Sequence, residues 1–248
     1  MSERPRVVSA LPSAITLLGV FGGFLRLVWA PFHPYWAACA IIGASLCDMI
    51  DGRVARLTGT SSEFGVQLDS LADLASFGVA PAFLVYHWAI ATRTSFDGFD
   101  LLVVPAFLFV AACAVRLARF NLHASGATTE EPGLHIVGLP TPVAALFMTT
   151  LIMAEHEAGL GWLRSAPLLV TVLIVLSLLM VSRITFPSYK RFRSRARQLA
   201  FFAAIVSGLT LLVAGGPGGT VLFVLMLAYV IVGGALGIAR ATPRPANR

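Results

Sequence analysis

Long apolar stretches separated by short polar segments make up most of this chain. A helix that crosses a bilayer needs about 20 mostly apolar residues, and eight stretches come near that length. They lie near residues 11–30, 35–57, 66–90, 101–120, 139–156, 166–186, 199–214 and 219–239. The hydrophobic pattern therefore predicts an all-α polytopic membrane protein with about eight transmembrane helices. The first stretch is long enough to span, so we interpret it as a helix and not as a cleaved signal peptide.

The composition agrees with this class. Of the 248 residues, 57% are hydrophobic and 12% are charged, and the mean hydropathy is +0.84. A net charge of +6 and a pI near 9.9 also occur in nucleic-acid-binding proteins, but the basic residues here follow the predicted loops and form no soluble patch interleaved with aromatic residues. We therefore expect membrane lipids, and no nucleic acid, as partners.

The basic residues also predict how the chain is oriented. Cytoplasmic loops of membrane proteins carry an excess of Lys and Arg. If both termini are cytoplasmic, all of the 18 basic residues except Arg26, Arg93 and Arg164 fall on the cytoplasmic side. The densest run, KRFRSRAR at 190–197, could attract anionic lipid headgroups or could be a plain topological anchor.

Four aspartates stand out in the second and third predicted helices. Asp48 and Asp51 are three residues apart, and Asp69 and Asp73 are four apart, so each pair projects from one face of its own helix. The short segment between the pairs can turn one helix back on the next. The orientation predicted above places this cluster on the cytoplasmic side.

Carboxylates in a membrane need compensation, because an unpaired acid costs at least about 2.5 kcal/mol there. Hard oxygen ligands without nearby Cys or paired His favour Mg²⁺ or Mn²⁺ over zinc, and two such ions would balance four charges. Two-metal sites hold the attacking and leaving oxygens of a phosphoryl transfer. The alternatives are a structural salt-bridge cluster, a cation transporter or an intramembrane prenyltransferase. A cation transporter would be expected to have a repeated second half, and an intramembrane prenyltransferase a second Asp-rich motif. The sequence shows neither feature.

The full pattern reads Asp-x2-Asp-Gly-x2-Ala-Arg-x8-Gly-x3-Asp-x3-Asp over residues 48–73. It resembles, at every fixed position, the signature of the CDP-alcohol phosphatidyltransferase family. This resemblance implies a membrane enzyme that cleaves the diphosphate of a CDP-linked lipid and passes the phosphatidyl group to an alcohol. It further implies a homodimer.

The resemblance also implies roles for individual residues. Two Mg²⁺ or Mn²⁺ ions per active site would be bound by the four aspartates, Asp48, Asp51, Asp69 and Asp73. Asp73 would in addition be the catalytic general base. The residues expected to bind CDP and its diphosphate are Gly52, Ala55, Arg56 and Gly65. Gly and Ala let a flat ligand approach the backbone closely, whereas Arg56 could instead be an ordinary cytoplasmic-side arginine.

Further segments narrow the resemblance to one group within the family. RLARFN (116–121), GLPTP (138–142) and VSRITFPSYK (181–190) are similar to segments of bacterial integral-membrane CDP-diacylglycerol:serine phosphatidyltransferases. The similarity covers about residues 11–190. It implies CDP-diacylglycerol and L-serine as substrates and the bacterial inner membrane as the location. We expect a six-helix catalytic domain over 1–190, and a basic loop with a C-terminal helix pair over 191–248.

The acceptor side of the predicted site is less specific. Serine carries a carboxylate, which a guanidinium can bind through two hydrogen bonds. The candidate acceptor-binding residues are Ser76, Arg116, Arg119, Asn121, Arg183 and Lys190. The arginines could equally bind a lipid phosphate or simply follow the topology. The same chemistry with glycerol phosphate, inositol phosphate or choline as acceptor therefore stays open as an alternative.

Overall fold

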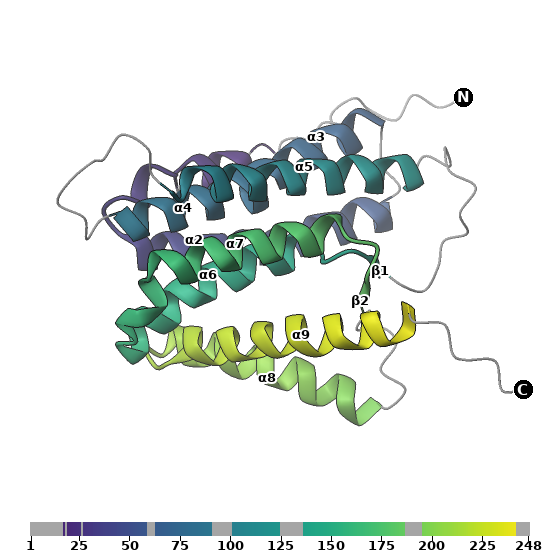
Figure 1. The fold of residues 1–248 in the computed structure, drawn as a ribbon. Helices are drawn as coiled ribbons and strands as arrows, with labels where there is room; N and C mark the ends of the chain where they lie inside the picture. Colours follow the sequence, from purple (N-terminus) through teal and green to yellow (C-terminus); the bar gives the residue numbers. More distant parts are fainter. Residues whose placement is uncertain are drawn as a thin grey trace, which may run out of the picture.

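The computed structural model describes residues 17, 19–25, 27–58, 63–90, 101–124, 136–186 and 195–241; for 47–58, 63, 123–124, 136, 195–202 and 240–241 it describes the backbone only. The described chain is mostly helical (Figure 1). In chain order its elements are a helix over Gly19–Trp29, α2 (Pro34–Thr58), α3 (Glu63–Asp73), the π-helix η1 (Leu74–Val79), α4 (Ala80–Ile90), α5 (Val103–Ala124), β1 (Ile136–Val137), α6 (Thr141–Ala158), the 3₁₀-helix η2 (Gly161–Arg164), α7 (Ala166–Val181), β2 (Thr185–Phe186), α8 (Arg195–Val213) and α9 (Gly218–Ala241).

A helix lies in each of the eight stretches predicted from hydrophobicity. Within the described residues, three helices are long and apolar enough to cross a membrane by length and composition: Phe64–Ile90, Val103–Leu122 and Gly218–Ala239. Shorter apolar helices lie over Gly19–Trp29, Pro34–Leu46, Ala166–Val181 and Ala203–Val213. The chain is therefore a helical membrane protein, and eight crossings remain a prediction.

Helix α6 lies at the centre of the bundle. It packs against α2 on one side and α9 on another, while α5 packs against α7 and η1. Met148, Leu151 and Met153 of α6 are almost completely buried in the core. The C-terminal pair is part of this packing, because α9 contacts both α6 and β2 and also pairs with α8.

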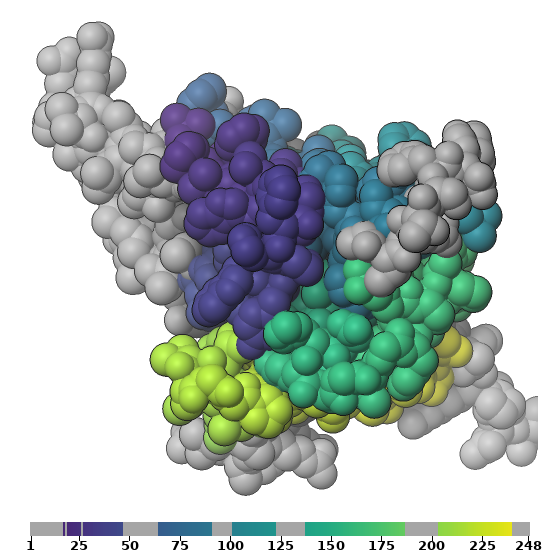
Figure 2. All heavy atoms as spheres, turned by 90° about the vertical axis from the view of Figure 1, so that its left-hand side faces the viewer, coloured from purple at the N-terminus to yellow at the C-terminus, as the bar shows by residue number. Residues whose placement is uncertain are grey.

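The four tryptophans of the chain all lie at one end of the bundle, which we call the tryptophan end. Trp29 and Trp36 flank the turn before α2, Trp88 is near the end of α4, and Trp162 lies in η2. Figure 2 looks onto this end, which is on the left in Figure 1. Arg164 also lies here, donating from Nε to the carbonyl of Trp88 at 2.7 Å. Tryptophan is enriched at membrane–water interfaces, so we assign this end to one interface.

The opposite end, which we call the motif end, carries the two short strands (Figure 1). They pair antiparallel, with Ile136 opposite Phe186 and Val137 opposite Thr185. Gly138 follows with a positive φ of 76°, and its N–H donates to the carbonyl of Ile184 at 2.9 Å. The strands were not predicted, and α7 ends at Val181 instead of continuing to 186. A two-residue strand is too short to leave an alternating pattern in the sequence.

The helix that follows the second aspartate pair changes its winding. Residues Leu74–Val79 form a π-helix between α3 and α4, and the N–H of Ala80 donates to the carbonyl of Ala75, five residues earlier. Pro81 comes next and has no N–H to continue an α-helical ladder. Within the π-helix, Gly78 approaches α5 so closely that a Cβ there would lie 3.1 Å from the Cys113 sulfur. Such π-turns are rare and occur frequently at functional sites.

Candidate functional site

Asp69 and Asp73 lie one turn apart on α3, just before the π-helix. Asp69 is exposed and Asp73 is half-buried. The other aspartate pair belongs to the last part of α2, which runs without interruption to Thr58. The side chains of Asp48, Asp51, Gly52, Ala55 and Arg56 lie outside the described residues, so their predicted roles stay predictions. Gly65, in the first turns of α3, is half-buried.

A guanidinium stands beside the second aspartate pair. Arg116 of α5 is half-buried and has an attractive electrostatic interaction with Asp73. Its Nη1 donates to the hydroxyl of Thr141 at 3.1 Å. Its Nε is buried and has no hydrogen-bond partner among the described residues. A buried N–H without a partner is costly, so this nitrogen is suited to meet a ligand oxygen.

Three segments that carry the predicted subfamily resemblance meet at this point. Arg116 reaches Thr141 of GLPTP, and the Arg119 Nη1 donates to the carbonyl of Val181, at the start of VSRITF, at 3.1 Å. GLPTP and VSRITF are joined in turn by the hydrogen bond from the Gly138 N–H to the Ile184 carbonyl at 2.9 Å. The paired strands lie directly beside this bond. Hydrogen bonds between residues up to 62 positions apart thus form one framework at the motif end.

Asn121 connects this framework to the aspartate helix. Its Nδ2 donates to the Ser70 hydroxyl at 2.8 Å, and that hydroxyl donates a hydrogen bond to the carbonyl of Val66 at 3.1 Å. Ser70 lies directly after Asp69 on α3. The Asn121 amide therefore holds the helix that carries both Asp69 and Asp73 against α5.

The remaining acceptor candidates are distributed differently. Ser76 is buried in the π-helix, and its hydroxyl lies 3.5 Å from where a Cβ at Gly23 would stand. Arg183 follows α7 and is exposed. Lys190 lies outside the described residues. The structure thus places Arg116 and Asn121 beside α3 and Arg119 against the end of α7. The role of each candidate stays a prediction.

Three residues of this site were missed by the sequence analysis. Thr141 is completely buried and binds Arg116, and Ser70 binds Asn121. Tyr229 of α9 interacts electrostatically with Arg116, and its ring stacks on Phe186 with centroids 6.1 Å apart. Thr141 lies in GLPTP and Ser70 lies in the aspartate signature. Both could have been considered as site residues because they are polar residues within these motifs. Tyr229 had no such signal, because α9 carries no motif.

The part of the chain that carries the four aspartates matches a known protein family. The family model described as CDP-alcohol phosphatidyltransferase matches residues 9–176, more than half of the chain. The chain belongs to the CDP-alcohol phosphatidyltransferase family. The protein is therefore a transferase, and the match includes all four aspartates together with Arg116, Thr141 and the π-helix.

Curated members of this family are similar over most of the chain. A Helicobacter pylori (strain 26695) protein named CDP-diacylglycerol–serine O-phosphatidyltransferase is 34% identical over 181 residues, 73% of each chain. A Mycobacterium leprae protein of the same name is 32% identical over 237 residues, 93% of this chain and 77% of the relative. A Methanothermobacter thermautotrophicus protein named archaetidylserine synthase is 35% identical over 181 residues, 72% of this chain and 70% of the relative.

Proposed function

We propose that this CDP-alcohol phosphatidyltransferase transfers the phosphatidyl group of CDP-diacylglycerol to the hydroxyl of L-serine, giving phosphatidylserine and CMP. The names of the H. pylori and M. leprae relatives specify this donor and this acceptor. The similarity to the M. leprae protein extends over almost the whole chain, so it includes the framework beside the aspartates as well as the signature itself.

The observation that carries the acceptor assignment is the placement of Arg116 beside Asp73. Serine needs a cation for its carboxylate and a base for its hydroxyl. The two side chains come from α5 and α3, which the bond from Asn121 to Ser70 joins, and they interact with each other. The unpartnered Nε of Arg116 supplies a donor for the serine carboxylate. Choline has no anionic group for this donor.

In the proposed reaction, Asp73 accepts the proton of the serine hydroxyl. The serine oxygen then forms a bond to the phosphorus of the phosphatidyl group. The bond from that phosphorus to the oxygen of CMP breaks, and CMP leaves with the electron pair. Arg116, held by Thr141, orients the serine so that its hydroxyl faces Asp73. Ser76, Arg119, Asn121, Arg183 and Lys190 would complete the acceptor side, Arg119 and Asn121 chiefly by holding α5 in place.

The donor set fits a hard divalent cation. Asp69 and Asp73, one helical turn apart and with exposed or half-buried side chains, offer carboxylate oxygens of the kind that Mg²⁺ and Mn²⁺ prefer. We propose that Asp48 and Asp51 complete a site for two ions. When bound, the ions would supply positive charge beside the phosphoryl oxygens. Gly52, Ala55, Arg56 and Gly65 would contact the CDP.

The assembly and location follow from the same assignment. We propose residues 1–190 as the catalytic domain and 191–248 as a basic loop and helix pair, in a homodimer of the bacterial inner membrane. Both termini would face the cytoplasm, where CDP-activated lipids are made available. The tryptophan end then faces the outer side and the motif end faces the cytoplasm.

The test is CMP release by purified protein in detergent with CDP-diacylglycerol and Mn²⁺. L-serine, glycerol 3-phosphate, inositol phosphate and choline are compared, and Asp73→Asn is the inactive control. We expect release with L-serine alone, and none from the variant. Release with a different acceptor would overturn the serine assignment while leaving the family chemistry intact. Full serine-dependent activity of Asp73→Asn would overturn the role of Asp73.

A further inference from the structure

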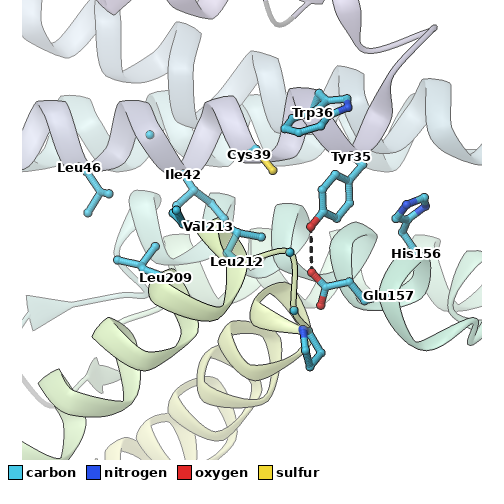
Figure 3. A pocket seen from close by; sticks show the side chains of 14 residues that line it. Tyr35, Trp36, Cys39, Ile42, Leu46, His156, Glu157, Leu209, Leu212 and Val213 are labelled. Atoms are coloured by element: carbon cyan, nitrogen blue, oxygen red, sulfur yellow. Dashed lines mark hydrogen bonds between the residues drawn. The ribbon is translucent and has the colours of Figure 1, made fainter.

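A cavity of about 910 Å³ lies between α2 and α8 and reaches the tryptophan end of the bundle (Figure 3). We call it the α2–α8 cavity. It is open on one side, because Trp36, Leu46 and Val213 line it and are still 65%, 37% and 89% exposed. None of Asp69, Asp73 or Arg116 lines it, and its walls come from α2, α6, α8 and the turn before α9. Among the described side chains, the cavity is therefore separate from those of the proposed active site.

One end of the cavity is polar, and the carboxylate there has all of its hydrogen bonds within the protein. Tyr35 donates its hydroxyl proton to Oε1 of Glu157 at 3.1 Å, as drawn in Figure 3. The same oxygen accepts from the N–H of Gly219 at 3.0 Å, and Oε2 accepts from the N–H and the hydroxyl of Thr220 at 2.8 and 2.9 Å. Each carboxylate oxygen thus has two donors, which fills its acceptor capacity. The carboxylate has no capacity left to recognise a ligand.

Beyond Tyr35, Glu157 and His156, whose ring lies beside that of Tyr35, the lining is apolar. In Figure 3 it extends away from Tyr35 and Glu157 between α2 and α8. The apolar side chains are Cys39, Ile42 and Leu46 on α2 and Leu209, Leu212 and Val213 on α8. The group that fills the cavity must therefore be a hydrocarbon, with its polar part outside at the tryptophan end.

The length of the cavity identifies that hydrocarbon. Tyr35 and Leu46 both line it, and at 1.5 Å per residue they are about 16 Å apart along the axis of α2. Half of a bilayer's hydrocarbon core is about 15 Å. The tryptophans place the polar end at the level of the interface. A chain entering there would reach the middle of the membrane, as a fatty-acyl chain does.

We propose that the α2–α8 cavity binds one acyl chain of a membrane phospholipid from the leaflet at the tryptophan end. This lipid is bound apart from the substrate, and it fills the space between α2 and the C-terminal helix pair. The proposal does not depend on the identity of the acceptor alcohol, since it concerns a different part of the molecule.

Gly43 offers a variant that fills the cavity. It lines the cavity, and a Cβ built on it would meet no atom within 4 Å, so the side chain of Gly43→Leu begins in open space. Gly234→Leu is the matched control, because Gly234 also has no atom within 4 Å of a Cβ and lies on α9 away from the cavity. Val213→Trp fills the cavity from α8, at an exposed position where the fold tolerates a larger side chain.

The experiment uses a phosphatidylethanolamine with a photoreactive diazirine at the end of one acyl chain. The full-length protein is reconstituted with it, irradiated, and mapped by peptide mass spectrometry. We expect label concentrated at 42–46 and 209–213 in the natural sequence and in Gly234→Leu. In Gly43→Leu and Val213→Trp it should fall by about tenfold, because displacing roughly two methylene groups weakens binding by that factor.

Two results would overturn the proposal. Label spread evenly over the lipid-facing helices and unchanged in both cavity-filling variants would mean that the cavity holds only bulk lipid. Efficient disulfide formation between Leu46→Cys in two copies, with no label at 42–46, would mean that a second copy of the chain covers the cavity.

Discussion

The Arg116 guanidinium on α5 is bound to the hydroxyl of Thr141, the first residue of α6, at 3.1 Å. Thr141 is fully buried between Pro140 and Pro142, which begin the helix, so its hydroxyl lies in the core. This contact orients the guanidinium beside Asp73, with which it interacts electrostatically.

Thr141→Val should lower the catalytic efficiency with serine as the acceptor. The change keeps the shape but removes the acceptor, so Arg116 loses its orientation. We expect kcat/KM for serine to fall about tenfold, or about 1.4 kcal/mol, with a smaller change in KM for CDP-diacylglycerol. Steady-state kinetics with each substrate varied in turn would measure this. Thr149→Val is the control, because the Thr149 hydroxyl is buried on the same helix and donates only to that helix, to Ala145 and Leu146. Equal losses in the two variants would contradict the positioning role.

Asn121→Ala and Ser70→Ala should not be additive. Each change breaks the 2.8 Å hydrogen bond that holds α3 against α5. A double-mutant cycle on kcat/KM should therefore give a coupling of about 1 kcal/mol. If Asn121 instead contacts serine directly, Asn121→Ala alone would raise KM for serine, and the coupling would be absent.

Gly138→Ala should destabilise the protein more than Gly159→Ala. Both glycines have a positive φ, 76° and 64°, so each substitution costs about 1 to 2 kcal/mol of strain. At Gly159 a Cβ meets nothing within 4 Å, whereas at Gly138 it would lie 2.4 Å from the carbonyl oxygen of Met180. We expect a further loss of roughly 1 to 3 kcal/mol from this overlap. Thermal unfolding in detergent, followed by fluorescence, should rank the two variants in that order; equal melting temperatures would argue against a tight contact before α6.

Glu157→Ala should weaken the attachment of the C-terminal helix pair. Its carboxylate accepts from Gly219 and Thr220 in the first turn of α9, and from Tyr35 of α2. Loss of a charged acceptor at a helix N-terminus should cost about 2 to 4 kcal/mol. Denaturant unfolding would measure this free energy. Glu155→Ala, one turn from the end of the same helix, is the control and should cost far less.

Removal of divalent cations should stop the reaction. EDTA is expected to abolish CMP release, and Mg²⁺ or Mn²⁺ should restore it. Asp69→Asn should raise the cation concentration needed for half activity by about tenfold or more, since it exchanges a carboxylate ligand for an amide. Glu155→Gln, at the tryptophan end, should leave that concentration unchanged. Activity that persists after complete chelation would contradict the proposed metal site.

The helices and the signature could be predicted from the sequence because both depend on the spacing of residues that are close together in the chain. Eight apolar stretches gave eight helical segments, and Pro140 and Pro142 do begin α6, as their chemistry favours. The aspartate pairs were placed on helices by the same spacing. The roles assigned to Asp48, Asp51, Gly52, Ala55 and Arg56 lie on side chains outside the described part of the chain and stay predictions.

The contacts that build the site could not be predicted, because they join residues far apart in the sequence. The bond between Arg116 and Thr141 and the bond between Arg119 and Val181 depend on how α5, α6 and α7 pack. The anchoring of α9 by Glu157 likewise links positions more than 60 residues apart. Nothing in the local pattern around Glu157 distinguishes it from Glu155. Only the packed bundle shows which of the two accepts hydrogen bonds from α9.

The π-helix over Leu74–Val79 sets the rotation of the two aspartates relative to α4. A π-turn holds about one residue more than an α-turn, and an α-helix turns by about 100° per residue. If Leu74–Val79 wound as a regular α-helix with no residue removed, and α4 kept its packing, Asp69 and Asp73 would be rotated away from Arg116 by about that angle. The π-helix thus lets the carboxylates of α3 keep their orientation toward α5 while Ala80–Ile90 keeps its packing in the core.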